Sequence, residues 1–442
     1  MNIIANKIDM KLNLNTEFWN WAYAIYYSVL TLVFFFEMQP NVSMSMTMRY
    51  VFFAAIFLPV LLRIKFFVPV FVFFMTASLH SFTPVLPTFS VFHLGLVVIA
   101  LFISKNKKVN LLPFVVLVAF VLLDVFYGNN AEWSLWIFVV FLVSLLICDR
   151  NDINNAVVAF MLASVFLALL YIVNYEAFEW TRHTTEDDYS TSGWTNHNKY
   201  DSTLGCGALL AVATFFGFFL ENRRNLLFKI IAAASVVLTV IVMLMDVSRG
   251  AIVSFCGGVF VLILMSKTKP KTKLITIVSL LIIVAVSLSF SSTDYLMSRF
   301  SEDNVATAGN RLEIWDVKFS LFFSDLDFRK LFFGIGWNDC RKLGVNISTH
   351  NDWITAFIAF GVVGLFLYMS LYLLLFRKTG LKNAAVLSVM AFLFLESMVV
   401  EPFFRGNAQM ALLYIIALKY ASVRKVSRQY TKGIKVSSIN SF

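Results

Sequence analysis

Long apolar stretches separated by short polar turns run through most of the chain. A helix needs roughly 20 apolar residues to cross the hydrocarbon core of a membrane. Two of the stretches, on either side of Arg63-Ile64-Lys65, are short, so they form either two spans or one re-entrant pair. The pattern therefore predicts an all-α fold, a polytopic bundle of 12–14 transmembrane helices. The segments are 18–37, 49–62, 66–80, 88–103, 109–126, 131–148, 156–175, 204–220, 228–247, 250–265, 273–290, 352–376, 384–400 and 408–422.

The composition supports this class. Hydrophobic residues make up 59% of the chain and charged residues 14%, whereas soluble domains average about 45–50% and about 25%. So much apolar surface does not fit inside soluble cores, which excludes a soluble enzyme, a disordered chain and a disulfide scaffold. We expect one integral membrane domain over 1–442. Among the four cysteines, a bridge between Cys206 and Cys340 is the one pairing that we leave open.

The cationic residues give the expected orientation. Cytoplasmic loops of membrane proteins are enriched in Lys and Arg. If the N-terminus is cytoplasmic and all fourteen segments cross, 24 of the 36 Lys and Arg residues lie on the cytoplasmic side. The net charge of +10 is then mainly a topology signal, and the basic tail 423–442 is a cytoplasmic anchor near anionic lipid. We expect no nucleic-acid partner, because nothing in the chain resembles a groove-reading module.

Two external loops are much longer than the others, 176–203 and 291–350. Loops of that length are usually functional or disordered. In the second loop, the stretch that begins at Arg311 has apolar residues at helical spacing, which predicts an amphipathic helix lying on the external membrane surface. We therefore expect the chemistry on the non-cytoplasmic face, where ATP is absent. The apolar positions of this helix are Leu312, Trp315, Phe319 and Phe322.

Several cations fall on that external face. Arg249 lies between two apolar segments, Arg311 opens the amphipathic helix, Arg405 lies in a tight turn and Lys199 precedes segment 204–220. Arg presents a planar fork of donors that suits phosphate oxygens, so the group favours a phosphate or diphosphate ligand. Two alternatives stay open: Arg249 extends to lipid headgroups, and Arg405 pairs with the nearby Glu401.

His350 is the leading candidate for proton transfer. It ends the long loop directly before segment 352–376, where either Thr349 or Asn351 would cap the new helix. A helix N-terminus favours anions, and histidine exchanges a proton near neutral pH. The alternative is an interfacial residue that only forms hydrogen bonds. His197, in the other long loop, is the second candidate. The sequence shows no His and Cys cluster typical of a metal site.

Two glycines follow His350 at helical spacing. Gly361 and Gly364 lie three residues apart on one face of the predicted helix. Pairs of small residues let membrane helices approach closely. We therefore expect segment 352–376 to pack closely against a neighbour at this point.

Four short motifs together resemble the bacterial O-antigen ligase and polymerase superfamily. The resemblance covers roughly residues 195–410, and it depends on the order of the motifs and on their placement on one face. The first 150 residues match only as generic membrane helices. The motifs are Ser248-Arg249-Gly250-Ala251, Gly309-Asn-Arg311-Leu-x-x-Trp315, Phe333-Gly-Ile-Gly336, and His350-Asn351 followed after nine residues by Gly361-Val-Val-Gly364.

The resemblance implies a C-type membrane glycosyltransferase with no metal ion and no cofactor. Its donor would be a glycan linked to undecaprenyl diphosphate, used at the periplasmic face of the bacterial inner membrane. His350 takes the place of the family's base or acceptor-positioning residue. Arg249 and Arg311 match the arginines that hold the diphosphate. The family has a further arginine near 190–204, where this chain offers only Lys199 or His197; Asn351 and Arg405 complete the candidate substrate-binding residues.

Three functions are possible, and the first two differ in the acceptor of the glycan. A ligase transfers the glycan to lipid A–core oligosaccharide, and a polymerase transfers it to another lipid-linked chain of O-antigen or exopolysaccharide. The spacing between His350-Asn351 and Gly361 favours the ligase, whereas a count of fourteen spans favours the polymerase; we choose the ligase. A polysaccharide exporter or flippase is the third possibility. It predicts charges spread along a mid-membrane pathway, whereas here the cations gather at one face and few acids lie near apolar segments, Asp124 and Glu396 among them.

Overall fold

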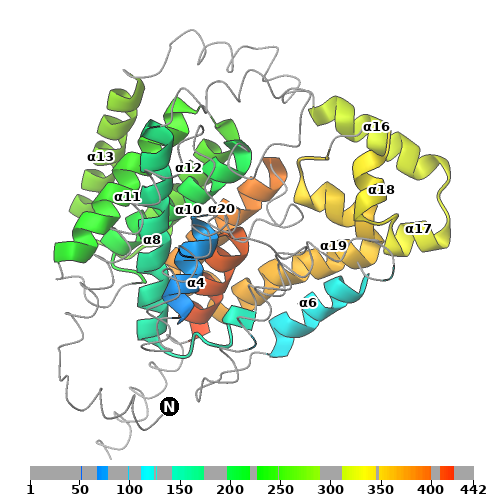
Figure 1. Ribbon diagram of the computed structural model, residues 1–442, viewed down its shortest axis with the longest axis horizontal. Coiled ribbons are helices and arrows are strands. Elements are labelled where there is room, and N and C mark those ends of the chain that lie inside the picture. The colour runs from blue at the N-terminus through cyan, green and yellow to red at the C-terminus, as the bar shows by residue number, and fades with distance from the viewer. Residues whose placement is uncertain are drawn as a thin grey trace, which may run out of the picture.

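The computed structural model describes helices throughout and no strand among the residues it places (Figure 1). Segment 18–37 and the tail 423–442 lie outside the described residues, and segments 49–62 and 88–103 contribute one residue each. The described residues are 67–77, 111–123, 142–173, 197–219, 226–246, 248–288, 311–344, 348–399 and 409–422, with 51, 98 and 126.

Most apolar segments that fall on described residues form helices, which confirms the all-α membrane class; in segment 131–148 the described end, 142–148, is mostly turn. Three helices of the described part are long and apolar enough to cross a membrane: α8, α11 and α19 over Asp352–Lys378. The helices are α4 Phe67–Thr76, α6 Leu111–Leu123, α8 Arg150–Val173, α10 His197–Phe215, α11 Leu226–Met245, α12 Arg249–Met265, α13 Pro270–Leu288, α16 Arg311–Ser324, α17 Phe328–Phe333, α18 Trp337–Lys342, α19 Asp352–Thr379, η4 Gly380–Lys382, α20 Ala384–Val399 and Gln409–Ser422.

Helix α10 begins earlier than the hydropathy pattern predicted. The predicted segment starts at residue 204, but the helix starts at His197 and takes in residues assigned to the loop 176–203. The added turns contain Asp201, Ser202 and Thr203, all of which are buried. The local sequence does not distinguish a polar residue that neighbouring helices bury from a polar residue in a loop. The hydropathy pattern therefore placed the start of this helix too late.

Helix α10 lies at the centre of the bundle and packs against α8, α11, α12 and α20. Small residues allow the close approach. A Cβ on Gly207 of α10 would overlap the Ser164 side chain of α8, and a Cβ on Gly257 of α12 would overlap Leu395 of α20. Close contact between α12 and α20 matters for the site below, since both helices carry polar groups at the same level.

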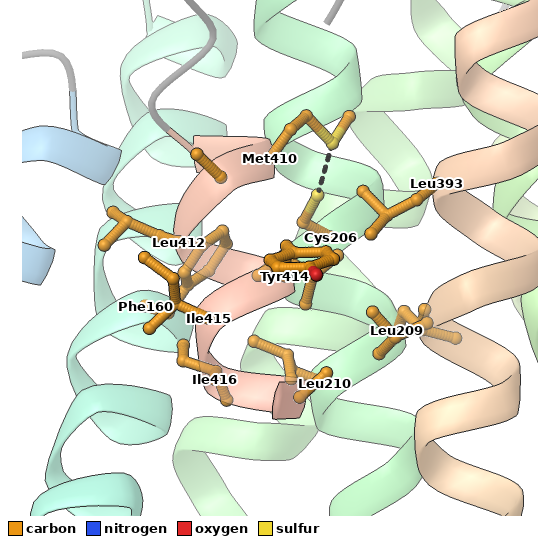
Figure 2. Close-up of a cluster of buried hydrophobic side chains, with 14 of the residues drawn as sticks. Phe160, Cys206, Leu209, Leu210, Leu393, Met410, Leu412, Tyr414, Ile415 and Ile416 are labelled. Atoms are coloured by element: carbon orange, nitrogen blue, oxygen red, sulfur yellow. Dashed lines mark hydrogen bonds between the residues drawn. The ribbon is translucent and has the colours of Figure 1, made fainter. Parts of the chain in front are cut away.

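The helix Gln409–Ser422 fills the space between α8, α10 and α20 with buried apolar side chains (Figure 2). The Sγ of Cys206 in α10 lies 3.3 Å from the Sδ of Met410. All four cysteines are free, so Cys206 and Cys340 do not pair. Cys206 is a small packing residue of this core.

Helices α16, α17 and α18 form a group at one side of the bundle, around the first half of α19 (Figure 1). Helix α16 confirms the predicted helix at Arg311, but its aromatic face packs on protein. The ring centroids of Phe322 and Phe319 lie 5.4 and 6.4 Å from that of Phe357 in α19. Leu312, predicted on the same face, is half exposed instead, because it lies at the end of α16 away from this aromatic cluster.

A buried lysine joins α16 to α18. The Nζ of Lys318 donates to the carbonyl oxygens of Cys340, Arg341 and Leu343, at 2.7, 3.2 and 3.1 Å. These carbonyls lie at the C-terminal end of α18, where no intrahelical donor remains and where a cation is favoured by the helix dipole. Lys318 therefore fixes the position of α18 relative to α16.

Helix α19 is broken at Gly361, so segment 352–376 is not the continuous helix that was predicted. Gly361 has φ 66° and ψ −162°, a region used almost only by glycine. A Cβ there would overlap the backbone of Phe332 in α17. The expected close packing is present, but the partner is the loop helix α17, and the glycine also ends the first half of the helix.

The two halves of α19 are braced across this break. The hydroxyl of Tyr368, after the break, donates to Oδ2 of Asp352 before it, at 2.9 Å. The ring of Trp353 stacks on Tyr372 with centroids 5.3 Å apart. Asp352 is buried at the N-terminus of α19, where the helix dipole favours its carboxylate. These contacts hold the first turn of α19 in one orientation.

Candidate functional site

The turn before α19 is built from polar side chains that bond to its own backbone. Oδ1 of Asn351 accepts hydrogen bonds from the backbone N–H groups of Trp353 at 2.9 Å and Ile354 at 3.1 Å. Asn351 is therefore the N-cap of α19, one of the two caps the sequence offered. The Thr349 hydroxyl lies 2.6 Å from that of Thr355 and donates to the Asn351 carbonyl oxygen at 2.9 Å.

The same asparagine joins this turn to α20. Its Nδ2 donates to the carbonyl oxygen of Met398 at 3.2 Å, and the side chain is buried. Beside it, Nε1 of Trp353 donates to Oγ of Ser397 at 2.7 Å. Asn351 was predicted as a substrate-binding residue. In the structure, both polar atoms of the Asn351 side chain form hydrogen bonds with backbone groups. Asn351 therefore holds the turn in place.

His350 lies between these two anchored residues. It is half-buried, and its backbone φ is 52°, in the left-handed region that few non-glycine residues occupy. Such a conformation costs on the order of 1–3 kcal/mol and persists only where the surroundings impose it. Here Thr349 and Asn351 impose it, and the imidazole is carried by a fixed turn at the N-terminus of a helix.

Helix α16 reaches this turn through Trp315. The indole Nε1 of Trp315 donates to the carbonyl oxygen of Thr349 at 2.7 Å, next to His350. Arg311 lies four residues before Trp315, on the same face of α16, and is half-buried. One hydrogen bond thus ties the helix that begins at Arg311 to the turn that bears His350, although these two predicted site residues are 39 positions apart in the sequence.

A buried acid completes the group. Glu396 of α20 is fully buried and accepts a hydrogen bond from the Ser202 hydroxyl of α10. Its other carboxyl oxygen, Oε2, and the hydroxyl of Ser254 in α12 are buried without a hydrogen-bond partner among the described residues. The sequence reasoning noted Glu396 only as an acid near an apolar segment. The signal that would have found it is an ionisable residue inside a predicted membrane helix, which is a functional candidate by default.

For the remaining predicted residues, the structure gives the position of the backbone only, except for Arg405, which lies outside the described residues. Arg249 is the first residue of α12, and Ser254 follows it at about 7.5 Å along the helix axis. His197 and Lys199 lie in the first turn of α10, one turn before Ser202. The starts of α10 and α12 therefore lie close to the Glu396 level.

The arrangement suits proton transfer beside an anion-binding surface. It combines a histidine on a fixed turn, a half-buried arginine, and the N-terminal end of α12, where backbone N–H groups favour negative charge. No group of three or more His, Cys, Asp or Glu side chains that could hold a metal ion occurs in the part of the chain that the structure describes.

The comparison with protein families agrees with the sequence motifs. The family described as O-antigen ligase matches residues 234–369. This stretch includes Arg249, Arg311, His350 and both glycine motifs, and it confirms the resemblance to the O-antigen ligase and polymerase superfamily. No curated protein matches the chain at a significant level.

Proposed function

Because residues 234–369 match the O-antigen ligase family, we propose that this protein is an O-antigen ligase of the bacterial inner membrane. It would transfer a glycan from undecaprenyl diphosphate to a hydroxyl of lipid A–core oligosaccharide at the periplasmic face. The observation that carries the proposal is the 2.7 Å hydrogen bond from Trp315 to Thr349, which ties α16, the helix that begins at Arg311, to the turn that bears His350.

In the proposed reaction, His350 accepts the proton of the acceptor hydroxyl as its oxygen attacks the anomeric carbon of the glycan. The bond between that carbon and the diphosphate oxygen breaks, and undecaprenyl diphosphate leaves with the electron pair. One glycosidic bond forms for each bond broken, so the donor supplies the energy. Fixed cations that face the leaving group stabilise the charge that develops on it, and this is the role of Arg249 and Arg311.

The other candidates have supporting roles in this proposal. Lys199 and His197, in the first turn of α10, replace the additional arginine of the family as a second contact to the diphosphate. Arg405 contributes to the same binding surface. Asn351 acts on the substrate through His350, because its side chain fixes the turn.

A polymerase is the second candidate function, since it uses the same donor and the same leaving group. The spacing of nine residues between His350-Asn351 and Gly361 favours the ligase. An acceptor that is a lipid-linked chain of O-antigen or exopolysaccharide would make the protein a polymerase with an unchanged mechanism. A non-catalytic exporter or flippase is a weaker third candidate and gives no role to His350.

Deletion of the gene in its host, followed by gel electrophoresis of the lipopolysaccharide, separates these functions. Loss of long chains from lipid A–core, with the chains still lipid-linked, supports the ligase. A single repeat unit on the core identifies a polymerase, and repeat units trapped on the cytoplasmic side identify a flippase. Complementation with the wild-type gene is the control, and complementation with H350A must leave the ligase defect unchanged.

A further inference from the structure

Helix α19 folds back on itself at Gly361. Asp352 and Tyr368 are 16 residues apart, which in an unbroken helix would separate them by about 24 Å along the axis. The Tyr368 hydroxyl nevertheless donates to Oδ2 of Asp352 at 2.9 Å. Gly364 lies where the two halves meet, since a Cβ on it would lie 2.8 Å from the carbonyl oxygen of Ala356. The second half of α19 therefore passes beside the first turn of the same helix.

Side chains of the second half form a closed ring of hydrogen bonds with that first turn. The Tyr368 hydroxyl, which donates to Asp352, lies 3.2 Å from the hydroxyl of Tyr372. The Tyr372 hydroxyl donates to Oγ of Ser397 in α20 at 3.4 Å, and Nε1 of Trp353 donates to the same oxygen at 2.7 Å. Trp353 follows Asp352 in the chain, so the ring closes on the first turn of α19.

The contact between Tyr368 and Asp352 is the part of this ring that reaches closest to the proposed base along the chain. Asp352 is the first residue of α19, directly after the N-cap Asn351 and two residues after His350. The Tyr368 and Asp352 side chains are 1% and 0% exposed, so water does not replace the tyrosine hydroxyl if it is removed. Loss of this hydroxyl therefore favours a movement of the first turn.

The backbone of His350 makes the turn sensitive to such a movement. Its φ of 52° lies in the left-handed region, which a non-glycine residue keeps only where its surroundings impose it. Hydrogen bonds of Thr349 and Asn351 impose it within the turn itself. Tyr368 adds a contact from the other half of the helix, and this contact holds the residue that follows Asn351.

We propose that Tyr368 is a positioning residue for His350 and acts through Asp352: it holds the first turn of α19 so that the imidazole meets the acceptor hydroxyl. The inference rests on the proposed function, because it takes His350 to be the base. The proposed diphosphate ligands Arg249 and Arg311 lie on other helices, α12 and α16. Tyr368 therefore serves the transfer step and not donor binding.

The test compares Y368F with Y414F in the full-length purified protein. Tyr414 is the matched control, because its buried hydroxyl also bonds to the second half of α19, where it donates to the carbonyl oxygen of Leu371 at 2.8 Å. D352N and D352N/Y368F complete a double-mutant cycle. The measured quantities are kcat for glycan transfer to lipid A–core and the Kd of undecaprenyl diphosphate in detergent.

We expect Y368F to lower kcat about tenfold, as for loss of one hydrogen bond to a buried carboxyl group, with the Kd of undecaprenyl diphosphate unchanged. Y414F should keep the wild-type kcat. The double variant D352N/Y368F should be no slower than D352N, because Tyr368 acts through Asp352. D352N alone should lower kcat at an unchanged Kd, which keeps the test decisive if Y368F does not fold.

Three results would overturn the inference: a wild-type kcat in Y368F, an equal loss in Y368F and Y414F, or losses in D352N and Y368F that multiply in the double variant. An equal loss in the two tyrosine variants would mean that Tyr368 supports only the fold. Failure of the proposed function gives a different result, because the wild-type protein then transfers no glycan and the inference fails with it.

Discussion

The backbone N–H of Gly336 donates a hydrogen bond of 2.9 Å to the carbonyl oxygen of Ala359, two residues before the break in α19. Next to it, Ile335 donates to Ile358 at 3.1 Å. The break at Gly361 leaves these two carbonyls without their helical donors, and the loop supplies the missing ones. The glycine motifs 333–336 and 361–364 therefore form one unit, which docks the loop helices on the first half of α19.

Replacing Gly361 by alanine should separate the loop from α19. The φ and ψ of 66° and −162° are nearly restricted to glycine, at a cost of about 1–3 kcal/mol for another residue, and the new Cβ would overlap the Phe332 backbone. We expect G361A to lose at least tenfold in glycan transfer and to become sensitive to protease within 311–344. V362A, at a half-exposed neighbouring position, is the control; equal behaviour of the two variants would contradict the role of the glycine.

Replacing Trp315 by phenylalanine removes the hydrogen bond to Thr349 and keeps the aromatic ring. A hydrogen bond of this kind contributes about 1 kcal/mol, so transfer should fall about fivefold if the bond positions α16. The measurement is the initial rate of transfer in purified protein. L312A, on the same helix and half exposed, should keep the wild-type rate. A W315F rate equal to that of L312A would show that the bond does not serve the reaction.

Replacing His350 should abolish transfer while the protein stays in the membrane. Loss of a general base typically lowers the rate by about 10²–10⁴-fold. H350N is the sharper variant, because asparagine accepts the left-handed backbone that this position has, so the turn should be preserved. The readout is transfer per amount of membrane-inserted protein for H350A and H350N. Activity of either variant near the wild-type level would exclude His350 as the base.

Replacing Arg249 should weaken stabilisation of the diphosphate leaving group. Removal of one donor that faces a developing negative charge costs about 10²–10³-fold in rate, and R249K should recover only part of it, because lysine lacks the planar fork. R377A, at the far end of α19 where the side chain is exposed, is the matched control. If R249A and R377A transferred glycan at the same rate, Arg249 would be a lipid-headgroup residue.

Transfer should proceed without ATP and without a divalent cation, because the lipid diphosphate supplies the energy and arginines replace the metal. We expect the purified protein to keep its full rate in EDTA when the lipid-linked donor is provided. The control is the same preparation with added Mg²⁺. A rate that EDTA abolishes and Mg²⁺ restores would contradict the proposed mechanism.

The sequence alone determined the membrane class and most of the helical segments. Burial of an apolar segment in lipid depends on the segment itself, so hydropathy reports it without knowledge of the neighbours. The same holds for the start of α19, where the sequence offered Thr349 or Asn351 as the N-cap, and for the helix at Arg311, because both depend on residues within one or two turns. His350 and Arg311 were recognised through motifs that lie in order along the chain.

Only the tertiary structure decided which distant residues meet. The start of α10 at His197 depends on helices that bury Asp201 and Ser202, and the break at Gly361 depends on carbonyl partners supplied by a loop 25 residues earlier. The contact of Glu396 with Ser202 joins positions 194 residues apart. Such contacts arise from packing between elements, and no local pattern of apolar and polar residues encodes them.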